Sequence, residues 1–467
     1  MSSKLSTTVR GPQRRFSARR GWLAATSALV GSLTLAIGHG AQALPTGGVV
    51  VGGTATVAGA PGALIVTQST QNAAINWQGF SIGQGESVQF VQPNAQSVVL
   101  NRVTGSDPST ILGRLSANGQ VFLVNPNGVL FGAGSQVNVG GLVASTADIK
   151  TADLMAGRYR FSGAGPGAVV NRGSIVADGG SVALLGATVS NQGVISARLG
   201  SVMLAAGGGM TLDVAGDGLL NVTVDEGALN ALAENGGLIQ ADGGRVLMTA
   251  HSANALLRTA VNNTGVIEAR SLQNHNGAIT LLGGDVRVSG SLDASGAAAG
   301  QSGGRIVATG ATVTLADHAR LDASGQAGGG VVLVGGDYQG KNPDIANAQS
   351  LDMGAGVTVS ADALGAGDGG KVVLWSDGQT GVAGTISARG GAQSGHGGFV
   401  ETSGHTVSTD GLTVTTLAPH GKTGLWLLDP VDYTGAASGG DETGAQVGLS
   451  LAASDRVITA SHDIVVS

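Results

Sequence analysis

The chain has 467 residues, of which 82 are glycine, 42% are hydrophobic and only 12% are charged. The glycine content excludes an ordinary globular composition, the lack of a Gly-X-Y period excludes collagen, and the hydrophobic fraction is high enough for a packed core. The net charge of −6 becomes −12 (18 Lys and Arg against 30 Asp and Glu) without the first 43 residues, which argues against nucleic-acid or anionic-membrane partners.

Residues 1–43 have the features of a secretory signal peptide. Lys4 and five arginines precede an apolar run from Trp22 to Ile37, and Ala41-Gln42-Ala43 follows it. The pattern predicts cleavage between Ala43 and Leu44. A membrane anchor is the weaker alternative, because the run is shorter than the ~20 apolar residues of a spanning helix. A twin-arginine signal at Arg14-Arg15 is a further alternative that the following residues support poorly.

The absence of cysteine is informative in an exported chain, where disulfides could form. Two interpretations stay open. The chain has to remain threadable through a pore, or its core is large enough to need no disulfides.

The segment from Asn76 to Thr146 contains three short polar motifs between strand-like stretches. They are Asn101-Arg102-Val103, Ala117-Asn118-Gly119 and Asn125-Pro126-Asn127-Gly128. The last motif predicts a β-turn, because proline fixes φ at the second position and Asn-Gly favours the end of the turn.

An internal repeat begins at Asn171. Asn171-Arg172-Gly173 opens NRGSIVADGGSVALLGATVS, and twenty residues later Asn191-Gln192-Gly193 opens NQGVISARLGSVMLAAGG. Related units recur at Gly237, Gly265, Gly304, Gly330, Gly370 and Gly384. A period near 20 indicates a solenoid, in which one coil cannot bury its own apolar face and neighbouring coils must stack.

Each repeat unit alternates apolar and small polar residues, as in Ile175 and Ala177 or Val182 and Leu184. This is the period of strands with one buried face, and Gly, Asn-Gly and Asp-Gly punctuate the strands as corners that tolerate positive φ. The leucine-rich repeat pattern and the aromatic signature of propellers are missing. We therefore predict an all-β, right-handed parallel β-helix without long helices.

These motifs resemble the secretion domain of two-partner-secreted filamentous haemagglutinins. Gly397-Gly398-Phe399-Val400-Glu401-Thr402-Ser403-Gly404-His405 and Trp426-Leu427-Leu428-Asp429-Pro430 are similar to the high-molecular-weight adhesin branch of that family. An Asn-Pro-Asn-Leu motif that marks another branch is missing. The long signal extension of some relatives is only partly present.

The resemblance implies a pathway and a partner. The chain would reach the periplasm, be recognised by a cognate outer-membrane barrel transporter, pass it unfolded, and fold at the surface of a Gram-negative bacterium. The resemblance also implies that a downstream region binds a receptor on a host cell or another bacterium. Asn125, Pro126, Asn127 and Gly128 carry the family's secretion motif, either as a corner that only helps folding or as a direct contact with the transporter.

Several patterns that suggest catalysis or cofactor binding lack the required context. Gly300-Gln301-Ser302-Gly303-Gly304 matches a nucleophile elbow but precedes no helix, and Gly365, Gly367 and Gly370 are followed by a strand rather than a helix. Gly421-Lys422-Thr423 lacks the first glycine of a P-loop. We expect His396, Glu401 and His405 to lie in solvated corners rather than to bind a metal.

No catalytic residue, metal, cofactor or small-molecule substrate is therefore expected. A β-helical polysaccharide-active enzyme is the competing class, but it needs paired carboxylates on one face, whereas Asp178, Asp242, Asp322 and Asp368 sit in corner sequence. The delivery stalk of a contact-dependent toxin is a further alternative.

We divide the chain into a signal peptide (1–43), a capped secretion domain (44–160), further coils (161–420) and a transition to a distal region (421–467). Asn221 and Asn262 match N-x-[ST] and are possible glycosylation sites, because the resembling adhesins are glycosylated. We expect no polar cap or covering helix at the C-terminal end, where Ile464, Val465 and Val466 form an apolar strand, and we expect the natural protein to continue beyond Ser467.

Overall fold

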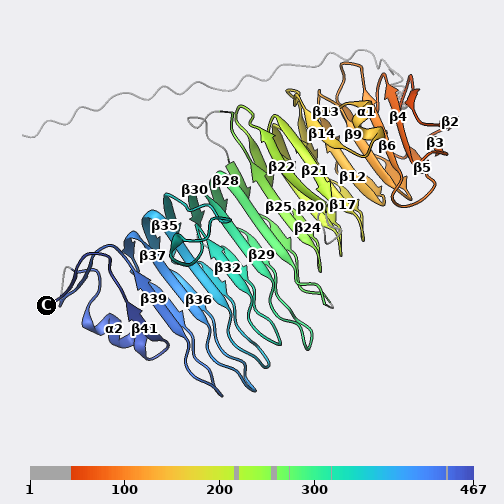
Figure 1. Ribbon diagram of the computed structural model, residues 1–467. Coiled ribbons are helices and arrows are strands. Elements are labelled where there is room, and N and C mark those ends of the chain that lie inside the picture. Colours follow the sequence, from red (N-terminus) through yellow and green to blue (C-terminus); the bar gives the residue numbers. More distant parts are fainter. Residues whose placement is uncertain (1–43, 215–219, 254–259, 273, 317, 438–439) are drawn as a thin grey trace, which may run out of the picture. The chain divides into compact units, whose positions relative to one another are not determined.

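The computed structural model describes residues 44–467 except 215–219, 254–259, 273, 317 and 438–439. The predicted signal peptide and the alanines of its cleavage site lie outside the described residues. The described chain is a parallel β-helix whose coils stack in sequence order (Figure 1). The predicted fold is confirmed.

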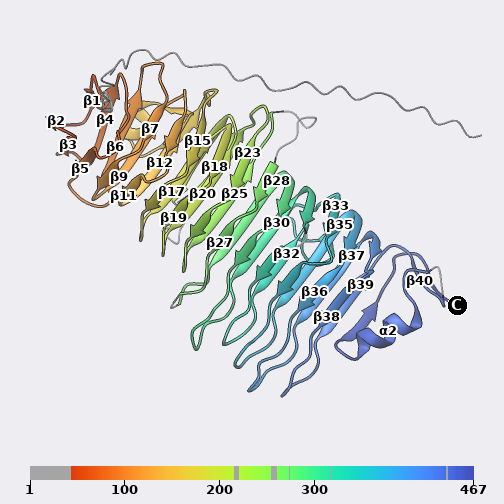
Figure 2. The same ribbon diagram turned by 180° about the vertical axis from the view of Figure 1, so that it is seen from behind.

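Most coils contribute one strand to each of three stacks, and strands in a stack pair in parallel with the same stack of the next coil (Figure 2). The first and second stacks join in one 22-stranded sheet, because the long strands β28, β30, β35 and β37 belong to both. The third stack is a separate 14-stranded sheet.

The first stack begins with the antiparallel strand β1 and continues with parallel strands. Its members are β1 (Val49–Gly52), β4 (Asn72–Trp77), β6 (Val98–Val103), β9 (Gln120–Val124), β12 (Gly141–Ser145), β17 (Ser181–Gly186), β20 (Ser201–Ala206), β25 (Arg245–Ala250), β28 (Ala278–Val288), β30 (Arg305–Leu315), β32 (Val331–Val334), β35 (Lys371–Val382), β37 (Phe399–Ser408), β39 (Leu425–Asp429) and β41 (Asp455–Ile458).

The second stack consists of the later halves of those long strands together with shorter ones. The shorter strands are β7 (Ser109–Ile111), β10 (Val129–Phe131), β15 (Ala168–Asn171), β18 (Thr188–Asn191), β23 (Leu232–Asn235), β26 (Ala260–Asn263) and β33 (Ser350–Met353).

The third stack begins with the antiparallel hairpin β2–β3. Its members are β2 (Ala55–Ala60), β3 (Ala63–Gln68), β5 (Ser87–Val91), β8 (Arg114–Ala117), β11 (Gln136–Asn138), β16 (Ser174–Val176), β19 (Val194–Ser196), β24 (Leu238–Gln240), β27 (Val266–Glu268), β29 (Ser291–Asp293), β31 (Arg320–Asp322), β34 (Thr358–Ser360), β36 (Gly384–Ser387) and β38 (Leu412–Thr415).

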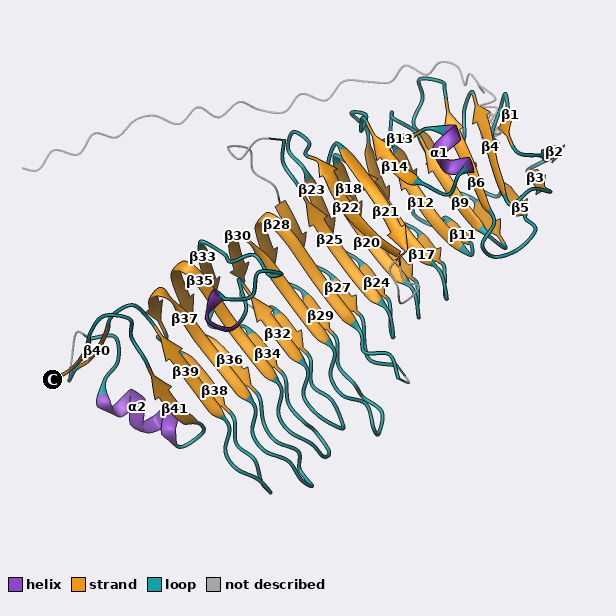
Figure 3. Ribbon diagram, in the orientation of Figure 1, coloured by secondary structure: helices purple, strands orange, loops and turns teal. Residues whose placement is uncertain are grey.

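Smaller elements lie outside the three stacks, among them the helices coloured purple in Figure 3. They are a four-stranded sheet of β13 (Asp148–Ile149), β14 (Tyr159–Ser162), β21 (Gly209–Val214) and β22 (Leu220–Glu226), the pair β40 (Tyr433–Gly435) and β42 (Ile464–Val466), the helices α1 (Thr151–Met155) and α2 (Gly444–Leu451), and the 3₁₀ turn η1 (Tyr338–Gly340).

The interior is built from columns of apolar side chains in register. In the third stack Ile175, Ile195, Ile239 and Ile267 occupy equivalent positions of successive coils and are fully buried. The predicted inward positions Ala177, Val182 and Leu184 are fully buried too. Each coil therefore buries the apolar edge of the coil before it, which is the main stabilising term of a solenoid.

Asparagines form a polar column inside this core. Asn171, Asn191, Asn235 and Asn263 are completely buried, and each of the first three donates its Nδ2 to the Oδ1 of the next at 2.8 Å. None of them has positive φ. The expectation that Asn-Gly forms a positive-φ corner is thus wrong for Asn235-Gly236, whereas Gly179 and Gly243 of the Asp-Gly pairs do have positive φ. The four asparagine side chains point inward and pair from coil to coil.

The outer face of the first stack is apolar where another element covers it. Ala183, Leu185, Met203 and Ala205 are buried, although alternation predicts that they face solvent. They pack with Phe161 and Met210 of the four-stranded sheet. The expectation of one buried face per strand is therefore wrong for β17 and β20, because the β21–β22 insertion folds back over them.

The C-terminal end is closed differently from the expectation. The inward column of the first stack ends at Trp426, and Arg456 of the following strand lies over its ring at 4.2 Å. The side chains of Arg456 and Glu442 are both buried and form an ion pair, and α2 contacts β38 and β41. A polar plug and a helix are thus present, while Ile464, Val465 and Val466 remain exposed as expected.

Candidate functional site: the secretion-motif corner and the outer groove

The Asn-Pro-Asn-Gly motif forms a closed turn between β9 and β10. The N–H of Gly128 donates to the carbonyl of Asn125 at 3.0 Å, and Gly128 adopts φ +115°. The predicted β-turn is confirmed. The Asn125 side chain is fully buried and donates to the carbonyl of Asp107 and to the Ser109 hydroxyl, both at 3.0 Å.

Pro126 and Asn127 are the half-buried residues of this corner. The Asn127 side chain donates to the carbonyl of Gly105 at 3.0 Å, which ties the corner to the loop of the preceding coil. On the other side, a Cβ at Gly167 would lie 2.3 Å from the Asn127 carbonyl carbon. The motif therefore fits between two coils, and its outer rim is what a partner could contact.

The other two family motifs are also engaged inside the fold. Asn101 is fully buried and accepts the indole N–H of Trp77 at 3.0 Å, while Arg102 donates to Asp148 at 2.8 Å and so holds the strand that precedes α1. Asn118 exchanges two hydrogen bonds with the backbone of Gln92, at 2.7 and 2.8 Å. Each polar side chain of these motifs joins one coil to another segment.

The remaining predicted positions lie apart from this corner. Leu44 is the first described residue and packs partly against the core. Asn221 lies exposed on β22, whereas Asn262 on β26 is half-buried and its Nδ2 lies 3.5 Å from Glu234. Asn221 is accordingly the more accessible of the two possible acceptors.

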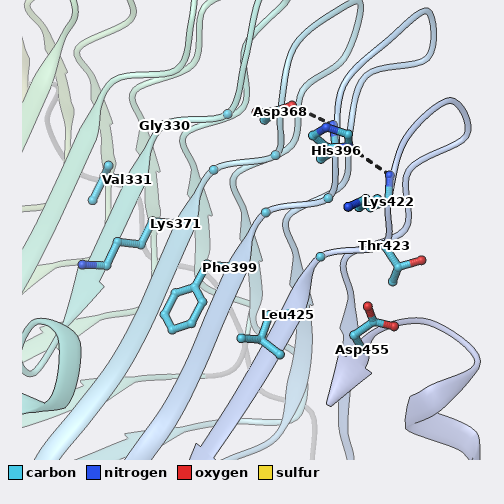
Figure 4. A pocket seen from close by; sticks show the side chains of 16 residues that line it. Gly330, Val331, Asp368, Lys371, His396, Phe399, Lys422, Thr423, Leu425 and Asp455 are labelled. Carbon is cyan, nitrogen blue, oxygen red and sulfur yellow. Dashed lines mark hydrogen bonds between the residues drawn. The ribbon is translucent and has the colours of Figure 1, made fainter. Parts of the chain in front are cut away.

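A surface groove of 640 Å³ crosses the first stack near its C-terminal end, and sequence reasoning did not predict it (Figure 4). It brings together Gly370, His396, Lys422 and Thr423, which come from three patterns set aside in the sequence. Figure 4 shows His396 between Asp368 and Lys422. The backbone N–H of His396 donates to the Asp368 carboxylate at 2.7 Å, and its ring Nδ1 accepts from the backbone N–H of Lys422 at 3.0 Å.

Most backbone donors of this groove are already used. The N–H groups of Gly370, Lys371 and Gly424 donate to the carbonyls of Ala361, Gly330 and Thr416 at 2.7–2.9 Å. A phosphate cradle needs several free N–H groups that converge on one point. In this groove the Lys371 N–H joins neighbouring coils instead, and the N–H groups of Gly370 and Gly424 close loops within their own coils.

Two of the three residues expected in solvated corners, Glu401 and His405, do not lie in corners. Both belong to β37, and Glu401 is fully buried, so the expectation of a solvated corner is wrong for it. Burial raises the pKa of Glu401 to about 7. Among the residues that the structure describes, no group of three or more His, Cys, Asp or Glu is arranged to hold a metal, and no helix is long and apolar enough to cross a membrane.

Comparison with known proteins places this architecture in a class. The family model of the TPS secretion domain matches residues 41–300. The chain is 33% identical over 272 residues to a heme/hemopexin-binding protein of Haemophilus influenzae, covering 55% of this chain and 29% of that protein. A second heme/hemopexin-binding protein of that species is 42% identical over 99 residues, covering 21% and 11%.

Among solved structures, the HMW1 secretion domain from Haemophilus influenzae has a TM-score of 0.71 and 34% identity, and the match covers 82% of this chain and 100% of that domain. The stacked coils and the matched motifs define a secretion domain of an exported β-helical protein. The chain belongs to the TPS secretion domain family, whose members are exported by two-partner secretion and displayed at, or released from, the Gram-negative outer-membrane surface. It spans less than a third of the length of the two Haemophilus heme/hemopexin-binding proteins.

Proposed function

We propose that this chain is the N-terminal secretion domain of a large surface adhesin and that a cognate outer-membrane transporter recognises it through the Asn125–Gly128 corner. The observation that carries the proposal is the order of pairing: every parallel strand of the described stacks pairs with the neighbouring coil of the same stack. A chain that emerges from a pore from one end can therefore fold one coil at a time. Each buried coil opposes backward movement.

Adhesion is proposed for the longer protein rather than for this domain. The names of the two Haemophilus relatives add haem or hemopexin capture as a candidate activity of a downstream region, and the delivery stalk of a toxin is the other candidate. The sequence of the region downstream of this domain would distinguish these three possibilities.

Asn127→Ala tests the role of the corner in transporter recognition. Asn127 is half-buried, so loss of its hydrogen bond to Gly105 should cost only about 1 kcal/mol of folding free energy. If the transporter reads the corner, surface export should fall at least about tenfold while the cleaved protein accumulates in the periplasm. Gly128 is left intact, because φ +115° would strain any other residue there.

Asn342→Ala is the control, since Asn342 is a half-buried asparagine whose side chain donates to Asp337 at 2.8 Å, and it lies outside the matched residues 41–300. Export can be measured by surface immunoblotting beside urea unfolding of the purified variants. Normal surface amounts of Asn127→Ala would show that the corner serves folding alone.

A further inference from the structure

Residues 335–349 leave the coil between β32 and β33 and lie over the outer face of the first stack; we call this segment the strap. Its Ile345 packs with a small apolar cluster on that face, formed by Val307, Leu333 and Val373. Gly336 and Gly340 lie so close to Trp375 that an added Cβ would come within 2.6 Å of the indole ring. The strap is thus a closely fitted cover.

The strap covers a column of outward-facing residues in register on successive strands. Val307, Leu333, Val373, Glu401 and Leu427 occupy equivalent positions of β30, β32, β35, β37 and β39. All five side chains are buried, and Glu401 is the only ionisable one among them. A carboxyl group therefore sits between apolar neighbours, where its ionised form is poorly solvated.

The strap itself supplies the hydrogen bond that this carboxyl receives. The N–H of Gln339 donates to the two Glu401 carboxyl oxygens at 3.1 and 3.4 Å, and Gln339 adopts φ +52°. Such a conformation is costly for a residue with a side chain and persists where the surroundings enforce it. The Gln339 side chain also reaches Asp429 at 3.4 Å and accepts from Lys341 at 2.8 Å.

Other charged groups surround the carboxyl of Glu401. Burial outweighs the other effects on its pKa. The Gln339 N–H of the strap and the Ser403 side chain lower this pKa, Asp429 on β39 raises it, and Lys371 on β35 lowers it. Lys371 is itself paired with Asp337 of the strap. Burial would raise the pKa of Asp337, but hydrogen bonds from Lys371, Asn342 and the Tyr338 N–H lower it to about 2.

We propose that the strap is a pH-dependent cover, which Glu401 keeps closed in mildly acidic surroundings and releases as the pH rises to neutrality and above. In the closed state a protonated Glu401 still accepts the Gln339 N–H through its carbonyl oxygen. An ionised Glu401 has to regain water, and the strap is the segment whose departure admits water. The opened strap would expose the apolar patch of Val307, Leu333 and Val373.

The direction and size of the effect follow from linkage. Burial raises the pKa of Glu401 from its ordinary value of 4.5 to about 7 in the closed state, so it favours closure fully below pH 4.5 and loses this contribution as the pH rises through about 7. A strap whose opening returned the carboxyl to full solvation would change its closing equilibrium by at most about 300-fold over this range. The Asp337–Lys371 pair acts in the opposite direction, but only below about pH 4, so closure is strongest near pH 4 to 5.

Hydrogen–deuterium exchange of residues 335–349 tests the proposal on purified residues 44–467. After correction for the intrinsic pH dependence of exchange, the strap should be protected at pH 5 and lose at least about tenfold of that protection at pH 8. Glu401→Gln keeps the shape but cannot ionise, so its strap should stay protected at both pH values. Asp352→Asn, an exposed acid on β33, is the matched control and should behave like the parent.

Equal protection of the wild-type strap at pH 5 and pH 8 would overturn the proposal without any variant. So would a Glu401→Gln protein that folds and keeps the full pH dependence. The fluorescence of Trp375, which the strap covers, gives a second reading on the wild-type protein and should shift between the same pH values.

Discussion

At the scale of single residues, the buried asparagine column stabilises the fold fully only while every one of its asparagines is present. Asn191 connects Asn171 to Asn235, so Asn191→Ala removes the acceptor of the first and the donor to the second. We expect about 2–4 kcal/mol loss of unfolding free energy, because two buried amides each lose a partner. Urea unfolding at equilibrium measures it, with Gln192→Ala, at the exposed adjacent position, as the control.

Replacement of the whole column should cost much less than its interruption. Later coils place Val288, Leu315 and Met353 in register after Asn263, which shows that the interior accepts apolar side chains there. A variant with valine at all four asparagine positions removes the side-chain donors and acceptors together and, within the described chain, leaves only the Gly173 N–H without its acceptor, so it should unfold within about 1–2 kcal/mol of the parent. A fourfold variant less stable than Asn191→Ala alone would contradict this account.

The corner that follows the third stack carries a second column, which alternates in charge. Asp178, Arg198, Asp242 and Arg270 follow the buried alanines of successive coils, and Asp362 and Arg389 repeat the alternation later. Asp362 is buried and receives the Arg389 backbone N–H at 2.7 Å, its guanidinium at 2.7 Å and the Ser387 hydroxyl at 2.5 Å. These contacts join Asp362 to Ser387 and Arg389 of the next coil, so they help to determine which coils pack together.

Asp362 and Arg389 should therefore contribute unequally to the free energy of unfolding. Asp362→Ala leaves the Arg389 N–H and the Ser387 hydroxyl without their acceptor and should cost about 1–3 kcal/mol. Arg389→Ala removes an exposed guanidinium while Asp362 keeps its other two donors, so it should cost less than about 1 kcal/mol. Thermal unfolding of both variants and the double variant checks the order. Equal losses of stability in the two single variants would mean that the exposed ion pair supplies most of the stabilisation.

At the scale of elements, the sequence predicts the coils well and their covers poorly. The alternation at Ile175 and Val182 determines which residues enter the core, because a strand in a solenoid has few other ways to bury them. The stretches SVALLG and SVMLAA break the alternation, and this break was the available signal of a covered outer face. It could not reveal the cover itself, since the β21–β22 hairpin is joined to the rest of the cover by β14, which pairs with β21 over a long sequence separation.

The residues of the candidate site also divide into those that the sequence predicts and those that it does not. The turn at Asn125–Gly128 was predictable because proline and glycine impose it locally. The burial of Glu401 was not, since it depends on a strap that begins more than sixty residues earlier in the chain. Polar residues in apparently regular strands therefore need tertiary information before they are assigned to the surface.

At the scale of the whole molecule, the reason for the absence of cysteine can be tested. The described coils pair only when the chain is folded, and the proposed export requires an unfolded chain. Ser174 and Val194 face one another on β16 and β19 of adjacent coils, on the outer face of the third stack. Neighbouring strands place the Cα atoms of such residues about 4.8 Å apart, within the Cα separation that a disulfide can span.

Ser174→Cys with Val194→Cys should therefore convert an exportable chain into one that stalls. Oxidation in the periplasm would close a covalent loop before the chain reaches the transporter, and a pore that accepts a single extended strand cannot pass that loop. Surface amounts should fall at least about tenfold and recover when reductant is added during export. The single variants, which cannot close the loop, should export normally.

Because the changes lie on the outer face, the purified and reduced double variant should unfold within about 0.5 kcal/mol of the parent, so a loss of export would reflect the cross-link rather than the fold. Normal surface amounts of the oxidised double variant would show that the chain crosses with a loop already formed, and coil-by-coil folding at the surface would then no longer explain its export.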